Sequence, residues 1–436
     1  MLQKVEEYAG RLGNQRHLIA LRNGIVLGMP LIIIGSLFLI LGNLPSEAYM
    51  NWISEAGIAP YFSKITNGSF GLMGLIAVFG IANSLTRHYG KDGISAGAIA
   101  LSAFVILTPN ISLPDIGTGI NYTYVGSAGL FIAIVVGLLT AEIFSFAVDR
   151  NWTIKMPEGV PPAVSRSFSA LIPGFLVIVL AGLVYAIMDI TGVADGNIHV
   201  LITQTIGRPF NAVGSSLWGS LLMIFLNSFF WFLGIHGNNI IGPIMQPVWL
   251  ANSDQNRLAF EAGEALMPNI ITNEFMNIFV WMGGGGSTLG LAIVLFFFTK
   301  SEQSKTLGRL VLPSGIFNIN EPLIFGLPIV LNFKLLVPFI LAPMAIAVVS
   351  YFAMSLGIVA APVGIVVPWT MPAIIAGYLA TGGAISGALL QAVTLVMSIA
   401  IYYPFVRSVD KDNLTREEAD RVAAQEELDN QAPLAE

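Results

Sequence analysis

The chain has 436 residues, of which 55% are hydrophobic and 11% charged, with a mean hydropathy of +0.76 and a formal net charge of −6. Soluble proteins average about 25% charged residues, so soluble enzyme, disordered chain, nucleic-acid-binding protein and disulfide-bonded scaffold are all poor interpretations. The composition predicts an all-α polytopic membrane protein, and the absence of cysteine excludes disulfides, thiolate metal ligands and a cysteine nucleophile in this chain.

Apolar runs of about 20 residues predict about ten transmembrane helices. These runs cover residues 18–43, 68–87, 93–109, 125–148, 165–190, 215–235, 275–299, 333–357, 362–381 and 383–406. The first run is longer than the core of a signal peptide and has no small-residue cleavage site before polar sequence, so we expect it to be retained as a helix.

The basic residues of the first half predict the orientation. A cytoplasmic N-terminus would place nine lysines and arginines inside, from Lys4 to Arg166, and only Lys64 and Arg208 outside. Because basic residues gather on the cytoplasmic side, we expect the N-terminus to be cytoplasmic.

Three segments of the second half are irregular. Residues 191–214 carry apolar side chains at helical spacing and predict an interfacial amphipathic helix. Residues 236–274 are too polar to cross a membrane simply, and residues 313–332 are interrupted by glycine, proline and asparagine. Both predict re-entrant hairpins, which are the best sequence indicator of a transporter's binding site.

These features suggest a division of the chain. Residues 1–190 contain five plain helices suited to a scaffold or a dimer interface, and residues 191–408 contain the interrupted segments suited to substrate. Residues 409–436 follow the last span. From residue 410 onward they hold nine acidic and three basic side chains, which account for the net charge, and they predict a solvated helix or a disordered end on the cytoplasmic side.

Familiar catalytic motifs are absent from the sequence. There is no P-loop, no H-E-x-x-H and no nucleophile elbow at a plausible strand-to-helix turn, and the four histidines lie far apart. We therefore expect no bound metal and no cofactor.

The first local cluster is Trp231 to Asn239, with the sequence WFLGIHGNN. His236 ends a long apolar run between glycines that let backbone approach a ligand closely, and its imidazole can bond to a sugar hydroxyl near neutral pH. The structural alternative is a histidine that caps a helix end at the membrane interface.

The second cluster is Phe317 to Gly326, with the sequence FNINEPLIFG. Glu321 is an ionisable group in an apolar stretch, and such groups usually mark a substrate path. A carboxylate there can act as a general base toward a hydroxyl. The alternative is structural, because Pro322 resembles the first residue of a helix, where acids are stabilising.

Other candidates have weaker signals. Trp231 and Trp369 could stack on a sugar or lie at the membrane interface, and for Trp281 we favour the interface. Asn83 is a weak polar candidate in the second predicted span. The glycine run 283–286 could be a hinge or a site of close packing.

With these two clusters, the chain resembles the membrane permease subunit, the IIC component, of bacterial sugar phosphotransferase systems, in the lactose, cellobiose and N,N'-diacetylchitobiose branch. The residues that carry the resemblance are 231–237 and FNINEPLIFGLPIVL at 317–331, together with LRNG at 21–24 and MPLIIIGS at 29–36. One departure is Phe333, where proline is expected. The fused IIB domain that lactose-type members often carry at the C-terminus is not seen here, so the cellobiose or chitobiose type fits better.

The resemblance implies a homodimer in the bacterial inner membrane whose C-terminal region binds a β-linked disaccharide and moves across the membrane. It implies that a separate cytoplasmic IIB protein phosphorylates the sugar from a phosphocysteine, so the chain is not expected to catalyse the reaction alone. By this resemblance Glu321 and His236 are the expected catalytic pair. Substrate binding is assigned to His236, Glu321, Asn320, Asn239, Trp231, Trp369 and, more weakly, Asn83.

The residues alone leave other functions open. Glu321 and His236 could instead form the proton relay of an ion-coupled sugar transporter. A membrane-embedded enzyme or sensor is a third possibility, with little support because no catalytic constellation is present. Only the resemblance favours group translocation.

Overall fold

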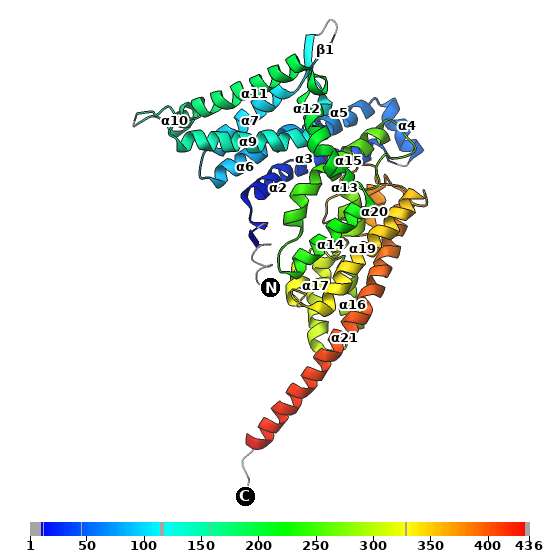
Figure 1. Ribbon diagram of the computed structural model, residues 1–436. Helices are drawn as coiled ribbons and strands as arrows, with labels where there is room; N and C mark the ends of the chain where they lie inside the picture. Colours follow the sequence, from blue (N-terminus) through cyan, green and yellow to red (C-terminus); the bar gives the residue numbers. More distant parts are fainter. Residues whose placement is uncertain are drawn as a thin grey trace.

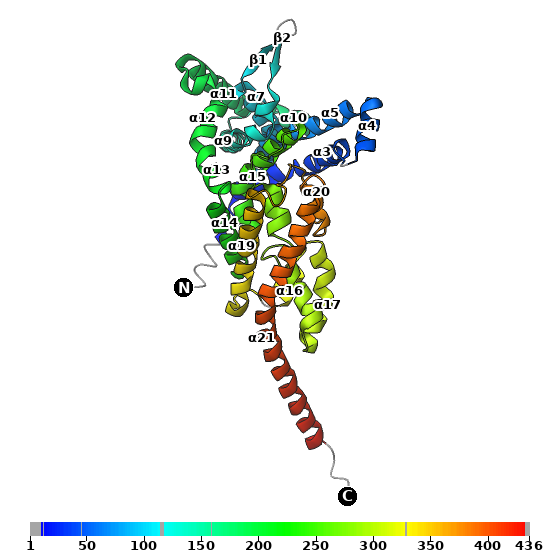
Figure 2. The same cartoon turned by 90° about the vertical axis from the view of Figure 1, so that its right-hand side faces the viewer.

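The computed structural model describes residues 10–431, except for residues 12, 45, 114–116, 158 and 328. The fold is almost entirely helical, and the sheet consists of one short hairpin. In Figures 1 and 2 the helices of the first half occupy the upper part of the molecule, and the long helices of the second half extend downward from them.

The first half begins with two pairs of helices joined by short breaks. Its helices are α2 (Arg16–Val26), α3 (Met29–Gly42), α4 (Glu47–Glu55), α5 (Ala59–Phe70), α6 (Met73–His88), α7 (Gly93–Leu107), α8 (Tyr122–Val125), α9 (Leu130–Asp149), α10 (Pro162–Ser169) and α11 (Leu171–Thr191). Local capping defines several starts: the Gln15 side chain accepts from the Leu18 N–H, and Asp92 accepts from the first amides of α7. The antiparallel strands β1 (Asn110–Leu113) and β2 (Gly117–Ile120) pair Asn110 with Ile120 and project at the end opposite the C-terminus (Figure 2).

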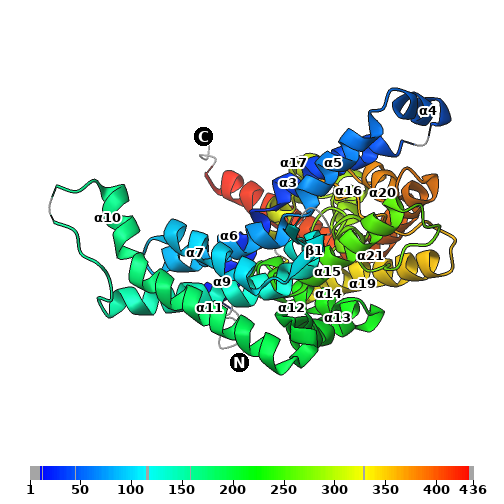
Figure 3. The ribbon, with the colours of Figure 1, turned by 90° about the horizontal axis from the view of Figure 1, so that it is seen from above.

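The second half starts with a bent connection and continues into long helices. Its elements are α12 (Ile198–Ile202), a π-helical turn (Thr203–Gly207), α13 (Arg208–Gly214), α14 (Leu217–Phe232), α15 (Asn238–Glu261), a second π-helical turn (Phe275–Val280), α16 (Leu289–Phe298), α17 (Glu302–Ile316), α18 (Glu321–Gly326), α19 (Phe333–Ser355), α20 (Ile375–Ala380) and α21 (Ile385–Gln431). Short 3-10 turns cover Ser127–Gly129 and Val193–Gly196. Seen from above, α10 and α4 extend to opposite sides of the molecule (Figure 3).

The all-α membrane fold class is confirmed, but fewer helices are straight and long than the apolar runs predict. Within the described residues, six helices are long and apolar enough to cross a membrane, or seven if the pair 198–214 and 217–232, bent by 79°, counts as one span. The predicted span 93–109 is the shorter apolar helix α7. The predicted spans 275–299 and 362–381 are broken, because a glycine run interrupts the first and three prolines with Gly364 interrupt the second.

The two predicted hairpins have different structures. Residues 313–332 form the end of α17, a tight turn and the short helix α18, as the interrupted sequence predicts. Residues 236–274 instead contain the continuous 24-residue helix α15, followed by an irregular return. Its polar side chains are tolerated because many are buried against protein; Asn252, Ser253 and Asn256 are at most 1% exposed.

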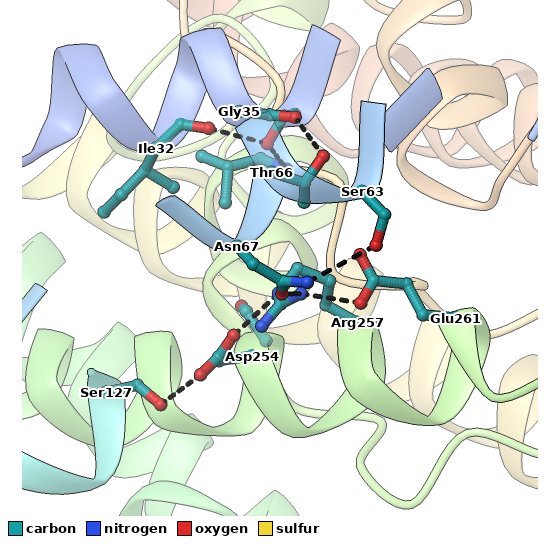
Figure 4. Close-up of polar contacts among 12 residues, drawn as sticks. Ile32, Gly35, Ser63, Thr66, Asn67, Ser127, Asp254, Arg257 and Glu261 are labelled. Atoms are coloured by element: carbon teal, nitrogen blue, oxygen red, sulfur yellow. Dashed lines mark hydrogen bonds and ion pairs between the residues drawn. The ribbon is translucent and has the colours of Figure 1, made fainter. Parts of the chain in front are cut away.

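A buried ionic cluster holds α15 against the first half (Figure 4). Arg257 donates from Nε to Asp254 Oδ1 at 2.8 Å, and from Nη1 to Glu261 Oε2 at 2.8 Å and Asn67 Oδ1 at 3.1 Å. Ser127 Oγ donates to the other oxygen of Asp254 at 2.5 Å. The cluster therefore joins α15 to both α5 and the turn before α9.

The predicted acidic tail begins inside the packed part of the molecule. Asp410 is 1% exposed and accepts hydrogen bonds from the Lys300 and Ser301 amides at the start of α17. From there α21 continues to Gln431 as a helix that extends away from the rest of the protein (Figure 1). Residues 432–436 lie outside the described residues.

Candidate functional site

A cavity of about 420 Å³ lies between the first helices of the chain and the interrupted segments of the second half. Its walls come from α2 and α3, α15, the turn at the tip of the α17–α18 hairpin, the glycine run 283–286 and the loop around residue 369. The structure thus brings together, from distant parts of the sequence, six of the seven predicted site residues: Trp231, His236, Asn239, Asn320, Glu321 and Trp369.

The two ionisable candidates lie near each other. His236 Nε2 is 4.0 Å from Glu321 Oε1, and their side chains are 38% and 50% exposed. The Trp231 ring packs on the imidazole with its centroid 4.2 Å away. His236 Nδ1 is buried and has no hydrogen-bond partner among the described residues, so a buried polar atom is free at this wall of the cavity.

Local sequence explains where these two side chains lie. α14 ends at Phe232 and α15 begins at Asn238, so His236 occupies the short turn between them. Glu321 is the first residue of α18, with Pro322 behind it, so its carboxylate lies in a first helical turn, where negative charge is stabilised. The helix-start interpretation of Glu321 and a position at the cavity are therefore both correct.

The hairpin tip is fixed by two asparagines. Asn318 Oδ1 accepts from the Gly283 amide at 2.6 Å, and its Nδ2 donates to the Trp369 carbonyl at 2.5 Å. Asn320 Nδ2 donates to the Gly285 carbonyl at 2.8 Å and to Thr288 Oγ1 at 3.1 Å, and the residue is 5% exposed. Both N–H groups of Asn320 are therefore bonded within the protein, so this side chain positions the hairpin and has no N–H left to donate to a ligand.

The glycine run 283–286 is a close-packing site. Gly284 and Gly286 have φ values of +91° and +81°. An added Cβ would lie 2.6 Å from Asn320 Cγ at Gly284 and 2.3 Å from the Phe339 ring at Gly286. Only glycine fits these positions without a shift of the surrounding atoms.

Two predictions from the sequence do not agree with the structure. Trp281, which we assigned to the membrane interface, is 4% exposed, lines the cavity and packs edge-on against Trp249 at 5.9 Å. Asn83 does not line the cavity, because α6 packs within the first half and the Asn83 side chain lies against Gly93 of α7.

Several lining residues were not predicted as site residues. Asn273 and Asn277 are linked by a 2.8 Å hydrogen bond, and Asn273 donates to the buried Glu274 at 3.3 Å. Arg22 reaches the cavity from α2. The sequence signal for Asn273 and Asn277 was their i, i+4 spacing beside a charged residue in an apolar run, and for Arg22 it was a guanidinium within the first predicted span.

Comparison with known proteins identifies the family of this chain. The profile of the family described as "Phosphotransferase system, EIIC" matches residues 22–343. The lichenan permease IIC component of Bacillus subtilis (strain 168) is 46% identical over 95% of this chain and 94% of its own length. The cellobiose-specific EIIC component of Geobacillus stearothermophilus is 43% identical over 96% of this chain and 95% of its own length.

A solved structure has the same fold over nearly its whole length. The transporter ChbC, the IIC component from the N,N'-diacetylchitobiose-specific phosphotransferase system, has a TM-score of 0.90 to this chain. The two are 42% identical, and the match covers 95% of this chain and 98% of ChbC. The chain therefore belongs to the phosphotransferase system EIIC family of membrane-spanning sugar permeases.

Proposed function

We propose that this chain binds a β-linked disaccharide of the cellobiose or diacetylchitobiose type, carries it across the membrane and presents it to a phosphorylated cytoplasmic IIB protein. The observation that carries the proposal is the shared cavity, which gathers a carboxylate, an imidazole, amide side chains and tryptophan rings. Such a mixture suits a sugar, because hydroxyls need hydrogen-bond partners and the apolar faces of the rings stack on aromatic side chains. The names of the relatives, a lichenan permease, a cellobiose-specific component and a diacetylchitobiose transporter, support the same substrate class.

Glu321 is the proposed general base. Its carboxylate takes the proton of the sugar's 6-hydroxyl as that oxygen attacks phosphorus; the new O–P bond forms while the P–S bond of the IIB phosphocysteine breaks and the thiolate leaves. His236 binds the sugar beside it. Phosphoryl transfer depends chiefly on in-line placement and charge stabilisation, so orienting the hydroxyl is the main task of this cavity.

The position of the cavity supports a division of roles between the two regions. We propose that residues 1–190 form a scaffold that dimerises with a second copy, and that residues 191–408 carry the sugar in an alternating-access movement against it. The cavity has walls from both regions, with α2 and α3 on one side and α15 and the hairpin tip on the other. A movement of one region relative to the other would therefore open and close it. The N-terminus and the acidic tail would face the cytoplasm.

The test uses vesicles that contain this protein and enclose a phosphoenolpyruvate-driven phosphotransfer mixture with a cognate IIB. Labelled cellobiose is added outside, and the chemical form of the label inside is measured. Sugar phosphate that appears only with phosphorylated IIB is the expected result. Free sugar accumulating under a pH gradient, with no need for IIB, would instead indicate a proton-coupled transporter with Glu321 and His236 as the relay.

The choice of sugar is tested in the same vesicles. A panel of cellobiose, diacetylchitobiose, other β-glucosides and lactose is compared by initial rate. Preference for a β-glucoside or diacetylchitobiose over lactose is expected, and preference for lactose would contradict the proposed substrate class.

A further inference from the structure

Arg22 is the one lysine or arginine among the described residues that line the cavity. It lies on α2 in the first half, whereas Glu321 and His236 belong to the second half. The residues that line the cavity from this side are Arg22, Val26, Met29 and Ile33. Their spacing places them on one face of the α2–α3 segment, so the guanidinium belongs to a continuous wall of the cavity.

The charge of Arg22 is not neutralised by a neighbouring carboxylate. Among the described residues, its side chain forms no ion pair or hydrogen bond with another side chain, although it is near enough to His236 to interact electrostatically. A guanidinium inside a predicted span is expensive unless it meets an anion or water. A neutral disaccharide can accept hydrogen bonds from this guanidinium but offers it no negative charge, whereas a phosphoryl group offers both.

The arrival of the phosphoryl group adds negative charge to the cavity. The transferring group carries negative charge on its equatorial oxygens, and Glu321 adds another negative charge beside it. Phosphoryl-transfer sites place arginine, lysine or a metal ion at those oxygens, because charge stabilisation supplies most of the rate enhancement. A guanidinium can hold two such oxygens at once.

We propose that Arg22 is a catalytic residue that binds the phosphoryl oxygens during transfer from IIB to the sugar, a role that rests on the proposed function of this cavity. Glu321 accepts the proton of the attacking hydroxyl, Arg22 holds the charge on the phosphoryl oxygens, and the IIB thiolate leaves with the electrons of the P–S bond. Because Arg22 and Glu321 belong to different regions, the site is complete only when the moving region brings the sugar to α2. Transfer is thereby restricted to one position of the carrier.

The first experiment compares two ligands with the purified full chain in detergent. The affinities for cellobiose and for its 6-phosphate are measured by calorimetry with the wild type, Arg22→Gln, Arg22→Lys and Arg166→Gln. Arg166 is an exposed arginine on α10 away from the cavity, so it controls for a general loss of positive charge. We expect Arg22→Gln to bind cellobiose within about threefold of the wild type and the phosphate at least about tenfold more weakly, with Arg22→Lys recovering most of the difference.

The second experiment measures a single turnover of phosphoryl transfer from phosphorylated IIB to bound cellobiose. Removing an electrostatic stabiliser costs about 10²–10³ in rate, so Arg22→Gln is expected to lose that much and Arg166→Gln little. Normal transfer by Arg22→Gln would overturn the proposal, and so would an equal loss of affinity for both ligands, which would make Arg22 a sugar ligand.

Failure of the proposed function is distinguishable from failure of this role. If the wild type never yields sugar phosphate, group translocation is wrong. The comparison of the two affinities still decides whether Arg22 forms an anion site. If it does, Arg22→Gln binds cellobiose 6-phosphate more weakly than the wild type but binds cellobiose equally well. If it does not, the two proteins bind the phosphate with the same affinity.

Discussion

At the scale of single residues, the 4.0 Å between His236 Nε2 and Glu321 Oε1 is longer than a direct hydrogen bond. One sugar hydroxyl placed between them could bond to both. The two side chains then have separable roles, because a base acts only in the chemical step, whereas a hydrogen-bond partner acts already in the complex.

Glu321→Gln is expected to slow phosphorylation far more than it weakens sugar binding. The amide keeps the shape and a hydrogen-bonding oxygen but cannot accept the hydroxyl proton, so the rate should fall by about 10²–10⁴. Single-turnover transfer and calorimetry measure the two effects. Glu302→Gln, at an exposed position on α17, is the control. Transfer at the normal rate by Glu321→Gln would exclude the base assignment.

His236→Ala is expected to weaken sugar binding by about 1–3 kcal/mol, or roughly 5- to 150-fold in Kd. The substitution removes the proposed hydrogen-bond partner of the sugar and also exposes the Trp231 ring that packs on the imidazole. Calorimetric titration with cellobiose provides the measurement. His88→Ala, an exposed histidine at the end of α6, should leave the affinity unchanged. If His236→Ala and His88→Ala bind cellobiose with the same affinity, His236 is not a sugar ligand.

At the scale of elements, one wall of the cavity is built from irregular backbone rather than from helices. The hairpin tip, the run 283–286 and the loop at Trp369 meet through the amides of Asn318 and Asn320. Because the backbone there is irregular, its polar groups must be bonded within the protein to be tolerated at membrane depth. The two asparagines supply those bonds.

Gly286→Ala is expected to destabilise the protein by at least about 1–3 kcal/mol. Its φ is +81° and the new methyl would overlap the Phe339 ring of α19, so strain and a clash add. The midpoint of thermal unfolding in detergent gives the measurement. Gly182→Ala in α11, where an added Cβ meets nothing within 4 Å, should leave the unfolding midpoint unchanged or raise it slightly. Matching midpoints for the two variants would contradict the close-packing interpretation.

At the scale of the whole molecule, polar contacts join the two halves. Besides the Arg257 cluster, the Val366 amide donates to Ser36 Oγ of α3 at 2.9 Å. Hydrogen bonds and ion pairs are directional, so such an interface holds a defined position. In the proposed carrier movement these contacts would have to break, or the residues on both sides of them would have to move together.

Arg257→Gln is expected to lower the free energy of unfolding by about 3–5 kcal/mol, because it leaves Asp254 buried without its cationic partner. Arg309→Gln on the exposed side of α17 is the control. Unfolding midpoints in detergent provide the comparison, and a difference of zero would show that the cluster contributes nothing to stability.

The sequence by itself determined the membrane class and most of the apolar spans, and it singled out His236 and Glu321, which lie 4.0 Å apart at one cavity. Hydrophobic length and an ionisable group in an apolar run are local signals, and they were sufficient for these conclusions. It also predicted the α17–α18 hairpin from its glycine, proline and asparagine residues.

Only the tertiary structure decided which distant segments share the cavity. Arg22 and Asn273 are recognisable in the sequence as polar residues in apolar runs, but neither that signal nor the hydropathy of Trp281 distinguishes a side chain that faces a cavity from one that faces lipid. Asn83 and Asn320 show the same limit in reverse: whether an amide is free to meet a ligand depends on the backbone packed against it. For Asn320 those contacts join residues 35 and 32 positions apart, beyond what periodicity and spacing can specify.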